Sequence, residues 1–244
     1  MADIIRLHQY PRGPGRLPNA SPFCMKLEGY LRLSGRPFEV VTSGNPKRGP
    51  KGQMPFISLG GRRIGDSGLI VAELEATAAE PVDGWLDDGQ RAVSALLTRT
   101  FEEHFLWAVI YARWLDPAAS PRWGRLLAGL TGLPYAVVPP MLPVARRLIR
   151  RRLHSQGTGR HSAAEIYALA APDLAAAAAI LGDKPFLFGG RLAVADLVLA
   201  AFIGGVLEMP WTGELDRAIA RHPALAAHFE RVLETVYGGL PSAE

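Results

Sequence analysis

The sequence has little cysteine, since Cys24 is the only one among 244 residues. One cysteine excludes an internal disulfide and a multi-cysteine metal cluster, and it fits a reducing compartment. Long apolar runs are also lacking, because no stretch reaches the ~20 uninterrupted apolar residues of a membrane-spanning helix. Residues 1–10 lack the basic start and apolar stretch of a secretory signal. We therefore expect a cytoplasmic protein without a transmembrane segment.

Metal-ligand patterns are lacking too, because the six histidines have no paired spacing with acids, and no metal site is expected. The formal net charge is +4, and the excess of basic residues is concentrated between Arg146 and His161. This run has no recognition motif and no interleaved aromatic residues, so we expect no nucleic-acid partner. It is typical of a solvated helix whose apolar side packs on the domain. Contact with an anionic membrane surface or an acidic ligand is the alternative.

Short strand-like and helix-like segments alternate in the first third of the chain. Gly60-Gly61 predicts a tight hairpin between two of the strands. Ser21 fits the N-cap of a helix, Pro22 fits its first position, and Gly35 ends it. The predicted strands are residues 4–9, 38–42, 55–59 and 62–64, and the predicted helices are 21–34 and 67–79.

The remainder of the chain reads as helical, after a turn-rich linker at 81–88. Apolar residues from Val93 to Leu115 mark one face of a long helix, and the stretch 117–143 predicts short helices and loops. Further helices are predicted at 162–181, 193–207 and 223–236. The chain thus divides into an α/β domain, residues 1–80, and an all-α domain, residues 88–240.

Three short motifs lie where a helix or strand begins, and each also has a plain structural interpretation. Ser21 begins a helix, where free N–H groups and the positive dipole end stabilise a thiolate, although an ordinary N-cap explains it too. Pro55 fits a plain strand-opening residue, or, if its peptide bond is cis, Met54 can offer its N–H and C=O to an extended ligand. Asp66 and Ser67 suit the ammonium and carboxylate of an amino acid, or simply cap a helix.

The order and spacing of these motifs resemble the thioredoxin-like domain of glutathione transferases. The string from Leu17 to Arg32, and the segment 159–162, are similar to the branch related to failed axon connections and metaxin proteins. Residues 184–196 resemble the start of the central helix of the helical domain, with Ala193 where Ser or Thr is usual, so that Asp196 is expected to be structural. The resemblance covers nearly the whole chain. It implies a four-stranded mixed sheet with helices, followed by an all-α domain.

The resemblance also implies a glutathione site. Ser21 would lie beside the sulfur as the catalytic residue, Met54 and Pro55 would hold the cysteinyl part, and Asp66 and Ser67 would hold the γ-glutamyl end. The implied binding set further includes Asn19, Phe23 and Lys51. Cys24, three residues into the predicted helix, is expected to be a packed and inert thiol. Serine at position 21 argues against thiol–disulfide exchange, because Ser forms no mixed disulfide.

We therefore predict a protein that binds glutathione as a co-substrate and transfers it to a small apolar electrophile. An aromatic acceptor pocket is predicted, with a core role as the alternative for each residue, from Tyr10, Trp107, Tyr111 and Trp114. The resemblance implies a homodimer. The second hypothesis is a non-catalytic binding or assembly module of the same fold, acting through the basic segment at a membrane surface or a protein partner.

Overall fold

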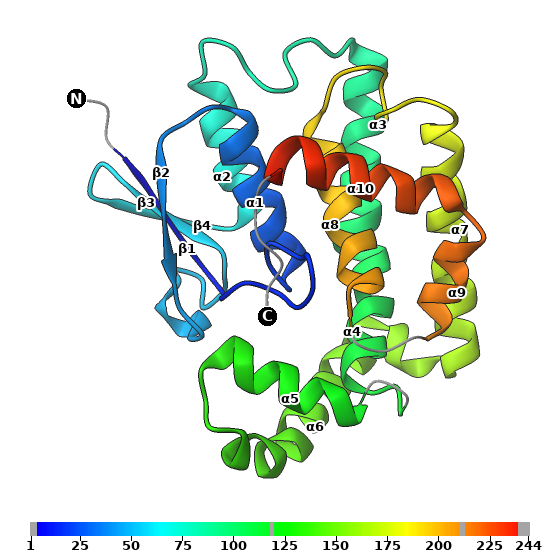
Figure 1. Cartoon of the computed structure of the whole chain (residues 1–244). Helices are drawn as coiled ribbons and strands as arrows, with labels where there is room; N and C mark the ends of the chain where they lie inside the picture. Colours follow the sequence, from blue (N-terminus) through cyan, green and yellow to red (C-terminus); the bar gives the residue numbers. More distant parts are fainter. Residues whose placement is uncertain (1–3, 118–119, 210–212, 239–244) are drawn as a thin grey trace.

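The computed structural model describes residues 4–117, 120–209 and 213–238, which form an α/β unit beside a larger helical unit (Figure 1). The predicted order of strands and helices in the first unit is confirmed. Its elements are β1 Ile5–Gln9, α1 Pro22–Leu33, β2 Phe38–Thr42, the 3-10 turn η1 Pro46–Arg48, β3 Phe56–Leu59, β4 Arg62–Gly65 and α2 Ser67–Ala76.

The four strands form one mixed sheet in the order β2-β1-β3-β4. β1 runs parallel to β2 and antiparallel to β3, and β4 is antiparallel to β3. Gly60 and Gly61 both have positive φ, 56° and 74°, which two-residue hairpins of this hand require and glycine adopts without strain. Helices α1 and α2 lie on the side of the sheet that faces the helical unit (Figure 1). The predicted fold class is therefore correct.

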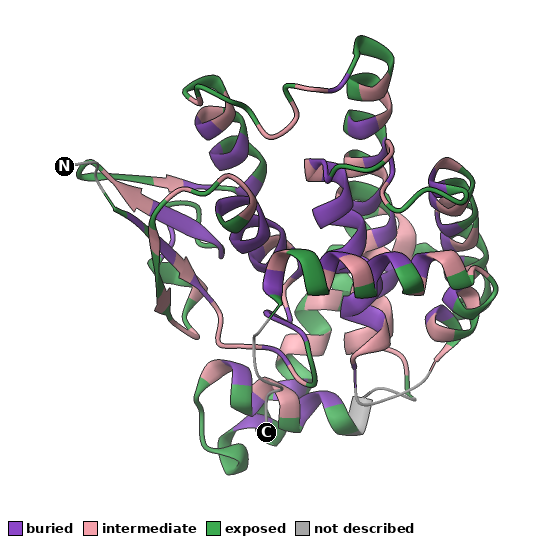
Figure 2. Ribbon diagram, turned by 45° about the horizontal axis from the view of Figure 1, so that its top comes forward, coloured by how far each residue is buried: buried purple, intermediate pink, exposed green. Residues whose placement is uncertain are grey.

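The helical unit is built around α8, Val194–Leu207, which is buried along nearly its whole length (Figure 2). α8 packs between α1 of the first unit and α10, Pro223–Tyr237. The three predicted C-terminal helices correspond to α7, α8 and α10. The other elements are α3 Asp88–Arg99, the π-helix η2 Thr100–Phe105, α4 Leu106–Trp114, α5 Ser120–Thr131, the 3-10 turns η3 Tyr135–Val137 and η4 Thr158–Arg160, α6 Val138–Gln156, α7 Ala163–Leu181, α9 Glu214–Ala220 and α10 Pro223–Tyr237.

The long helix predicted after the linker is interrupted by the π-helical stretch η2. Its apolar face repeats every four residues through Leu97, Phe101 and Phe105, all of which are buried. In an uninterrupted α-helix of 3.6 residues per turn, a four-residue spacing would rotate this stripe by about 40° at each step. The wider i→i+5 turn takes up that rotation and keeps both phenylalanines in the core.

One helix of the described residues, α7, is long and apolar enough by length and composition to cross a membrane, with a mean hydropathy of 1.5. This is weak evidence, because core helices pass the same test. In the structure α7 contacts α9, α10 and η2. Its Asp173 forms a hydrogen bond of 2.6 Å with His104, so α7 is a packed element of the helical unit.

The linker contains Asp83, whose ionisation should change the free energy of unfolding with pH. Asp83 accepts the N–H of Val194 at 2.8 Å, and burial, aided by Glu75 and Asp196, raises its pKa from 3.8 to about 6. The stability from this group is thus present below pH 3.8 and is lost as pH rises through 6, because the unfolded chain ionises first. We expect the free energy of unfolding of Asp83→Asn in urea to exceed that of wild type by an amount that grows to about 1–2 kcal/mol between pH 4 and pH 7. This range is reduced because the side chain is partly exposed to solvent.

The matched control is Asp88→Asn, since the side chain of Asp88 is 98% exposed in its ion pair with Arg91. This control should give a difference from wild type that changes little with pH. A pH-independent difference for Asp83→Asn would contradict the assignment.

Candidate functional site at the sheet edge

The pairing of the strands brings the three predicted motifs to one edge of the sheet. Phe56 of β3 pairs with His8 of β1 and with Gly65 of β4. Continuing these antiparallel registers by two residues places Pro55 and Met54 opposite Asp66 and Ser67 on one side and the end of β1 on the other. Since α1 and α2 both begin at this edge, their N-terminal N–H groups gather there.

Ser21 is the N-cap of α1, and its hydroxyl makes no bond to the helix backbone. The turn before it is fixed by Asn19, which is buried. The Asn19 side-chain amide donates to the carbonyl of Tyr10 at 2.7 Å, and its oxygen accepts the N–H of Ser21 at 3.0 Å. Asn19, predicted to bind glutathione, thus has both ends of its amide engaged in shaping the turn. The side chain of Ser21 makes no bond to its own helix, and its hydroxyl reaches the thiol of Cys24 instead.

Cys24 is fully buried in the first turn of α1. Burial raises the pKa of its thiol to about 12, and hydrogen bonds from the backbone of Tyr10 and the side chain of Ser21 offset only part of that rise. At neutral pH the thiol is therefore protonated and poorly nucleophilic. The prediction of a packed cysteine is confirmed.

The peptide bond between Met54 and Pro55 is cis, which the sequence left open. Met54 is buried with Cys24 and Phe56, and Tyr10 packs against the three. This cluster joins the start of α1 to the start of β3. Because β3 begins at Phe56, the backbone of Met54 lies outside the ladder, where it can pair with an extended ligand.

Asp66 caps α2, and its carboxylate accepts the N–H groups of Gly68 at 2.9 Å and Leu69 at 3.1 Å. Its φ of 85° is the one positive value found for a non-glycine residue in the described part of the chain. Such conformations cluster at ligand sites. Ser67 is buried, and its hydroxyl forms no hydrogen bond within the described ranges. The pair therefore offers an exposed carboxylate beside an unengaged hydroxyl.

Two other residues assigned to the glutathione site, Phe23 and Lys51, have different surroundings. Phe23 points to the helical unit, where its ring meets Phe202 of α8 edge-on at 6.1 Å. Lys51 is exposed in the loop between η1 and β3. Phe23 therefore serves the packing of the two units, whereas Lys51 is free to reach an anionic group.

The contacts divide the four residues of the predicted acceptor pocket. Tyr10 lies with Cys24 and Met54 at the sheet edge, and its pKa rises to about 12 mainly through burial. The remaining three come from α4, and each packs on a different partner. Trp107 lies under the guanidinium of Arg152, Tyr111 meets Tyr167 of α7 edge-on, and Trp114 meets Trp123 of α5 edge-on. No single cluster within the described residues contains all four.

Arg113 is a residue near the site that sequence reasoning missed. Its guanidinium donates to the carbonyl of Ala20 at 2.9 Å and to that of Gly205 at 2.8 Å. Burial lowers its pKa to about 10, so the group stays charged at neutral pH. It therefore fixes α4 to the turn that presents Ser21. The available signal was a lone charge in the apolar half of a helix.

Helix α5 closes the lower side of this region. Its end approaches the loop after β2 so closely that a Cβ on Gly44 would lie 2.5 Å from the carbonyl oxygen of Thr131. Its start is held by Trp123 against Trp114. α5 thus spans from the helical unit to the α/β unit. No group of three or more potential metal ligands is found in the described part of the chain.

Two family models match the chain, described as Glutathione S-transferase N-terminal domain over residues 22–119 and Glutathione S-transferase, C-terminal domain over residues 160–231. Together they cover more than half of the chain. They leave residues 120–159 unmatched, which contain α5, η3 and α6.

Among curated relatives, Failed axon connections of Drosophila melanogaster is 34% identical over 82% of this chain and 50% of that protein, so the chain spans about half the length of this relative. Isoprene-epoxide glutathione S-transferase of Rhodococcus sp. (strain AD45) is 29% identical over 88% of this chain and 92% of that protein. Metaxin-2 of Mus musculus is 23% identical over 93% of this chain and 86% of that protein. The resemblance to this branch is confirmed.

Among solved structures, a glutathione S-transferase from Methylobacterium radiotolerans in complex with glutathione sulfonate has a TM-score of 0.60 at 21% identity, over 98% of this chain and 96% of the other. At this identity the likeness shows the fold.

Proposed function

This chain belongs to the glutathione S-transferase superfamily, and we propose from this premise that it binds glutathione at the sheet edge and transfers it to a small apolar electrophile. One observation carries the proposal. The strand register brings Met54 and Pro55 beside Ser67, and Cys24, which packs on Met54 and accepts a hydrogen bond from Ser21, joins the start of α1 to the same edge. Two of the comparison proteins bear names that support glutathione as the ligand.

In this proposal Ser21 stabilises the sulfur of glutathione as a thiolate. A free thiol has a pKa near 8.5, so only a small share of it is ionised at pH 7. The N-terminus of α1 and a hydrogen bond from Ser21 both favour the anion. The hydroxyl that now meets the neutral Cys24 thiol would bond more strongly to a charged sulfur. Cys24 takes no part in the reaction because its own thiol stays protonated.

The rest of glutathione would lie along the strand starts. The backbone of Met54, which precedes β3 and lies outside the sheet ladder, pairs with the cysteinyl residue. The hydroxyl of Ser67 and the N–H groups of α2 take the γ-glutamyl carboxylate, and Asp66 takes its ammonium group. Lys51 is placed to meet the other carboxylate, while Asn19 and Phe23 act by shaping and packing the turn.

The electrophile would enter on the helical side, where the Tyr10 ring and the aromatic residues of α4 supply apolar surface. Of these, Tyr10 lies at the sheet edge with Met54, so it is the residue proposed to touch the acceptor. Trp107, Tyr111 and Trp114 would line the outer wall. The name of the Rhodococcus relative makes a small epoxide the first acceptor to try. We further propose a cytoplasmic homodimer, in line with the single cysteine and the family.

Calorimetric titration with reduced glutathione tests the binding step. We expect Ser67→Ala to weaken the affinity about tenfold, because a buried carboxylate contact loses its hydroxyl donor. Ser21→Ala should change the affinity by less than about threefold and lower the rate of epoxide conjugation about 10- to 100-fold, because its bond is to the thiolate alone. Ser34→Ala, at the far end of α1, is the matched control and should behave as wild type.

The absence of binding at millimolar glutathione would refute the proposal. Binding without conjugation, unchanged by Ser21→Ala, would instead favour the second candidate, a non-catalytic module that keeps the ligand site.

A further inference from the structure

The excess of positive charge of the protein lies around the stretch between the two regions that the family models match. Residues 117–164 contain eight arginines and no acidic residue. The rest of the chain has 19 basic and 23 acidic residues, a formal charge of −4 against +8 in this segment. The net charge of +4 is therefore unevenly distributed, with a large positive excess in the segment that contains α5 and α6.

Helix α6 presents three different faces around its axis. The first packs on the helical unit through Val138, Leu142 and Leu153, which are buried. This agrees with the sequence interpretation of a helix whose apolar side packs on the domain. The interpretation was incomplete, however, because two further faces remain exposed.

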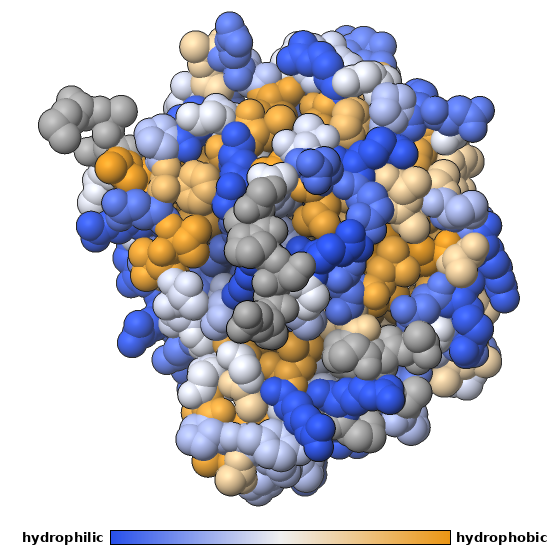
Figure 3. All heavy atoms as spheres, viewed as in Figure 1, coloured by the Kyte–Doolittle hydropathy of each residue, from blue (hydrophilic) through white to orange (hydrophobic). Residues whose placement is uncertain are grey.

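The second face is an exposed apolar stripe formed by Val137, the residue directly before α6, and by Met141, Val144 and Leu148. Their spacing of four, three and four residues aligns them along one side of the helix. Val144 is 64% exposed and Leu148 is 60% exposed. Six of the eleven exposed large apolar residues in the described part of the chain lie between 133 and 148, so this concentration is specific to the segment. Hydrophobic and hydrophilic residues lie side by side at this lower end of the molecule (Figure 3).

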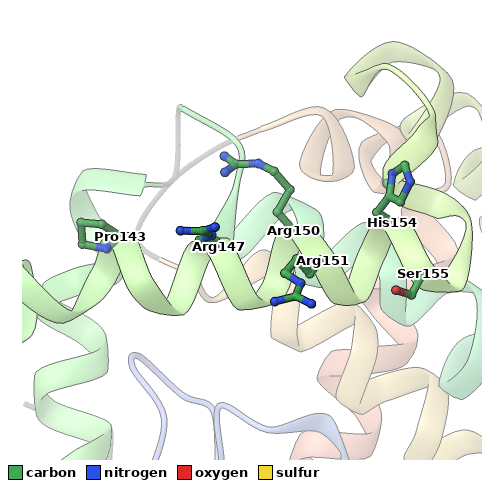
Figure 4. A pocket seen from close by; sticks show the side chains of 7 residues that line it. Pro143, Arg147, Arg150, Arg151, His154 and Ser155 are labelled. Atoms are coloured by element: carbon green, nitrogen blue, oxygen red, sulfur yellow. The ribbon is translucent and has the colours of Figure 1, made fainter.

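The third face is an arginine band formed by Arg147, Arg150 and Arg151, directly beside the apolar stripe. With Pro143, His154, Ser155 and Gly159 these residues line a shallow depression. The three guanidinium groups extend away from the helix axis (Figure 4). Within the described residues none of them forms an ion pair.

We propose that the exposed faces of α6 dock the protein on the surface of an anionic phospholipid bilayer, with the apolar stripe buried at the boundary between headgroups and acyl chains and the arginine band on the phosphates. An interfacial helix needs both components, since apolar burial and attraction to anionic lipid add together. A soluble acidic protein or a nucleic acid would engage the arginine band and leave the apolar stripe unused. The membrane is thus the partner that accounts for both faces. The docking is independent of glutathione chemistry.

Flotation with vesicles tests this proposal on the full chain. Wild type should bind vesicles of 30% phosphatidylglycerol in phosphatidylcholine at low salt, bind pure phosphatidylcholine weakly, and be released at high salt. Arg147→Gln/Arg150→Gln/Arg151→Gln should lower the partition coefficient on the order of 100-fold, since each basic residue near the surface contributes comparably. Val144→Ser/Leu148→Ser should lower it at least about tenfold through lost apolar burial.

Matched controls remove the same chemistry from other surfaces. Arg6→Gln/Arg99→Gln/Arg221→Gln removes three exposed arginines elsewhere, and Leu96→Ser/Leu169→Ser removes two exposed leucines from other helices. Both should bind vesicles as wild type does. Equal losses in the controls, or no binding of wild type to the anionic vesicles, would overturn the proposal. So would retention on heparin without vesicle binding, which would assign the face to a soluble polyanion.

Discussion

Replacing Asp196 by alanine is expected to lower the free energy of unfolding by about 3–5 kcal/mol. The carboxylate is fully buried at the start of α8. One oxygen accepts the N–H of Leu187 at 2.8 Å and Nε2 of His228 at 2.7 Å, and the other accepts the N–H of Ala193 at 2.8 Å. The substitution would leave these donors buried without partners, and such groups are costly. Guanidinium unfolding measures the loss.

Asp88→Ala makes the same chemical change at an exposed helix start, where Asp88 forms a surface ion pair with Arg91. It should cost less than about 1 kcal/mol. A similar small cost for Asp196→Ala would mean that Asp196 does not organise the junction of the 182–193 loop, α8 and α10. This role also explains how α8 begins at Ala193, which has no hydroxyl for a cap. The carboxylate of Asp196 holds the N–H of Ala193 by itself.

The fold could be predicted well because its determinants are local in sequence. Gly60 and Gly61 specify a hairpin by their backbone freedom, and Ser21 with Pro22 specifies a helix start. These signals survive in any tertiary context. The π-helical stretch was missed because the four-residue spacing of Leu97, Phe101 and Phe105 was attributed to an ordinary helix face, although that spacing does not match 3.6 residues per turn.

The meeting of the three motifs at the sheet edge was also predictable, since each motif sits at the end of an element and strand pairing then fixes where those ends meet. The acceptor side was not. The direction in which Trp107, Tyr111 and Trp114 point depends on the rotation of α4 about its axis, which the π-helical stretch changes. Arg113 donates to two carbonyl groups from distant elements, so no local pattern in the sequence reveals its position.

The exposed faces of α6 show the same limit. From sequence, Leu142, Val144 and Leu148 are equally apolar, and any of them would serve as the packed side. Only the position of α6 on the helical unit decides that Leu142 is buried and the other two are exposed. The run of arginines was visible in the sequence, whereas the apolar stripe beside it required the structure.

Replacing Lys26 by methionine is expected to destabilise the protein by about 3–5 kcal/mol, the range for removing one partner of a buried ion pair. Lys26 lies on α1, and its side chain is 3% exposed. Its ammonium group meets the carboxylate of Glu102, in the π-helical stretch, at 2.6 Å. The pair crosses between the two units, so the substitution leaves an uncompensated carboxylate in their interface. The measurement is guanidinium unfolding at pH 7.

A double-mutant cycle separates the loss of the pair from the loss of a side chain. Lys26→Met/Glu102→Met should recover most of the stability, because two apolar side chains replace a buried pair at little cost. Arg217→Met breaks the exposed Arg217–Glu214 pair and should cost less than about 1 kcal/mol. A double variant as unstable as Lys26→Met would show that packing around α1, and not the stranded charge of Glu102, sets the penalty. Recovery would show that the junction of the two units tolerates apolar contact, and that the stranded charge of Glu102, rather than lost packing, sets the penalty.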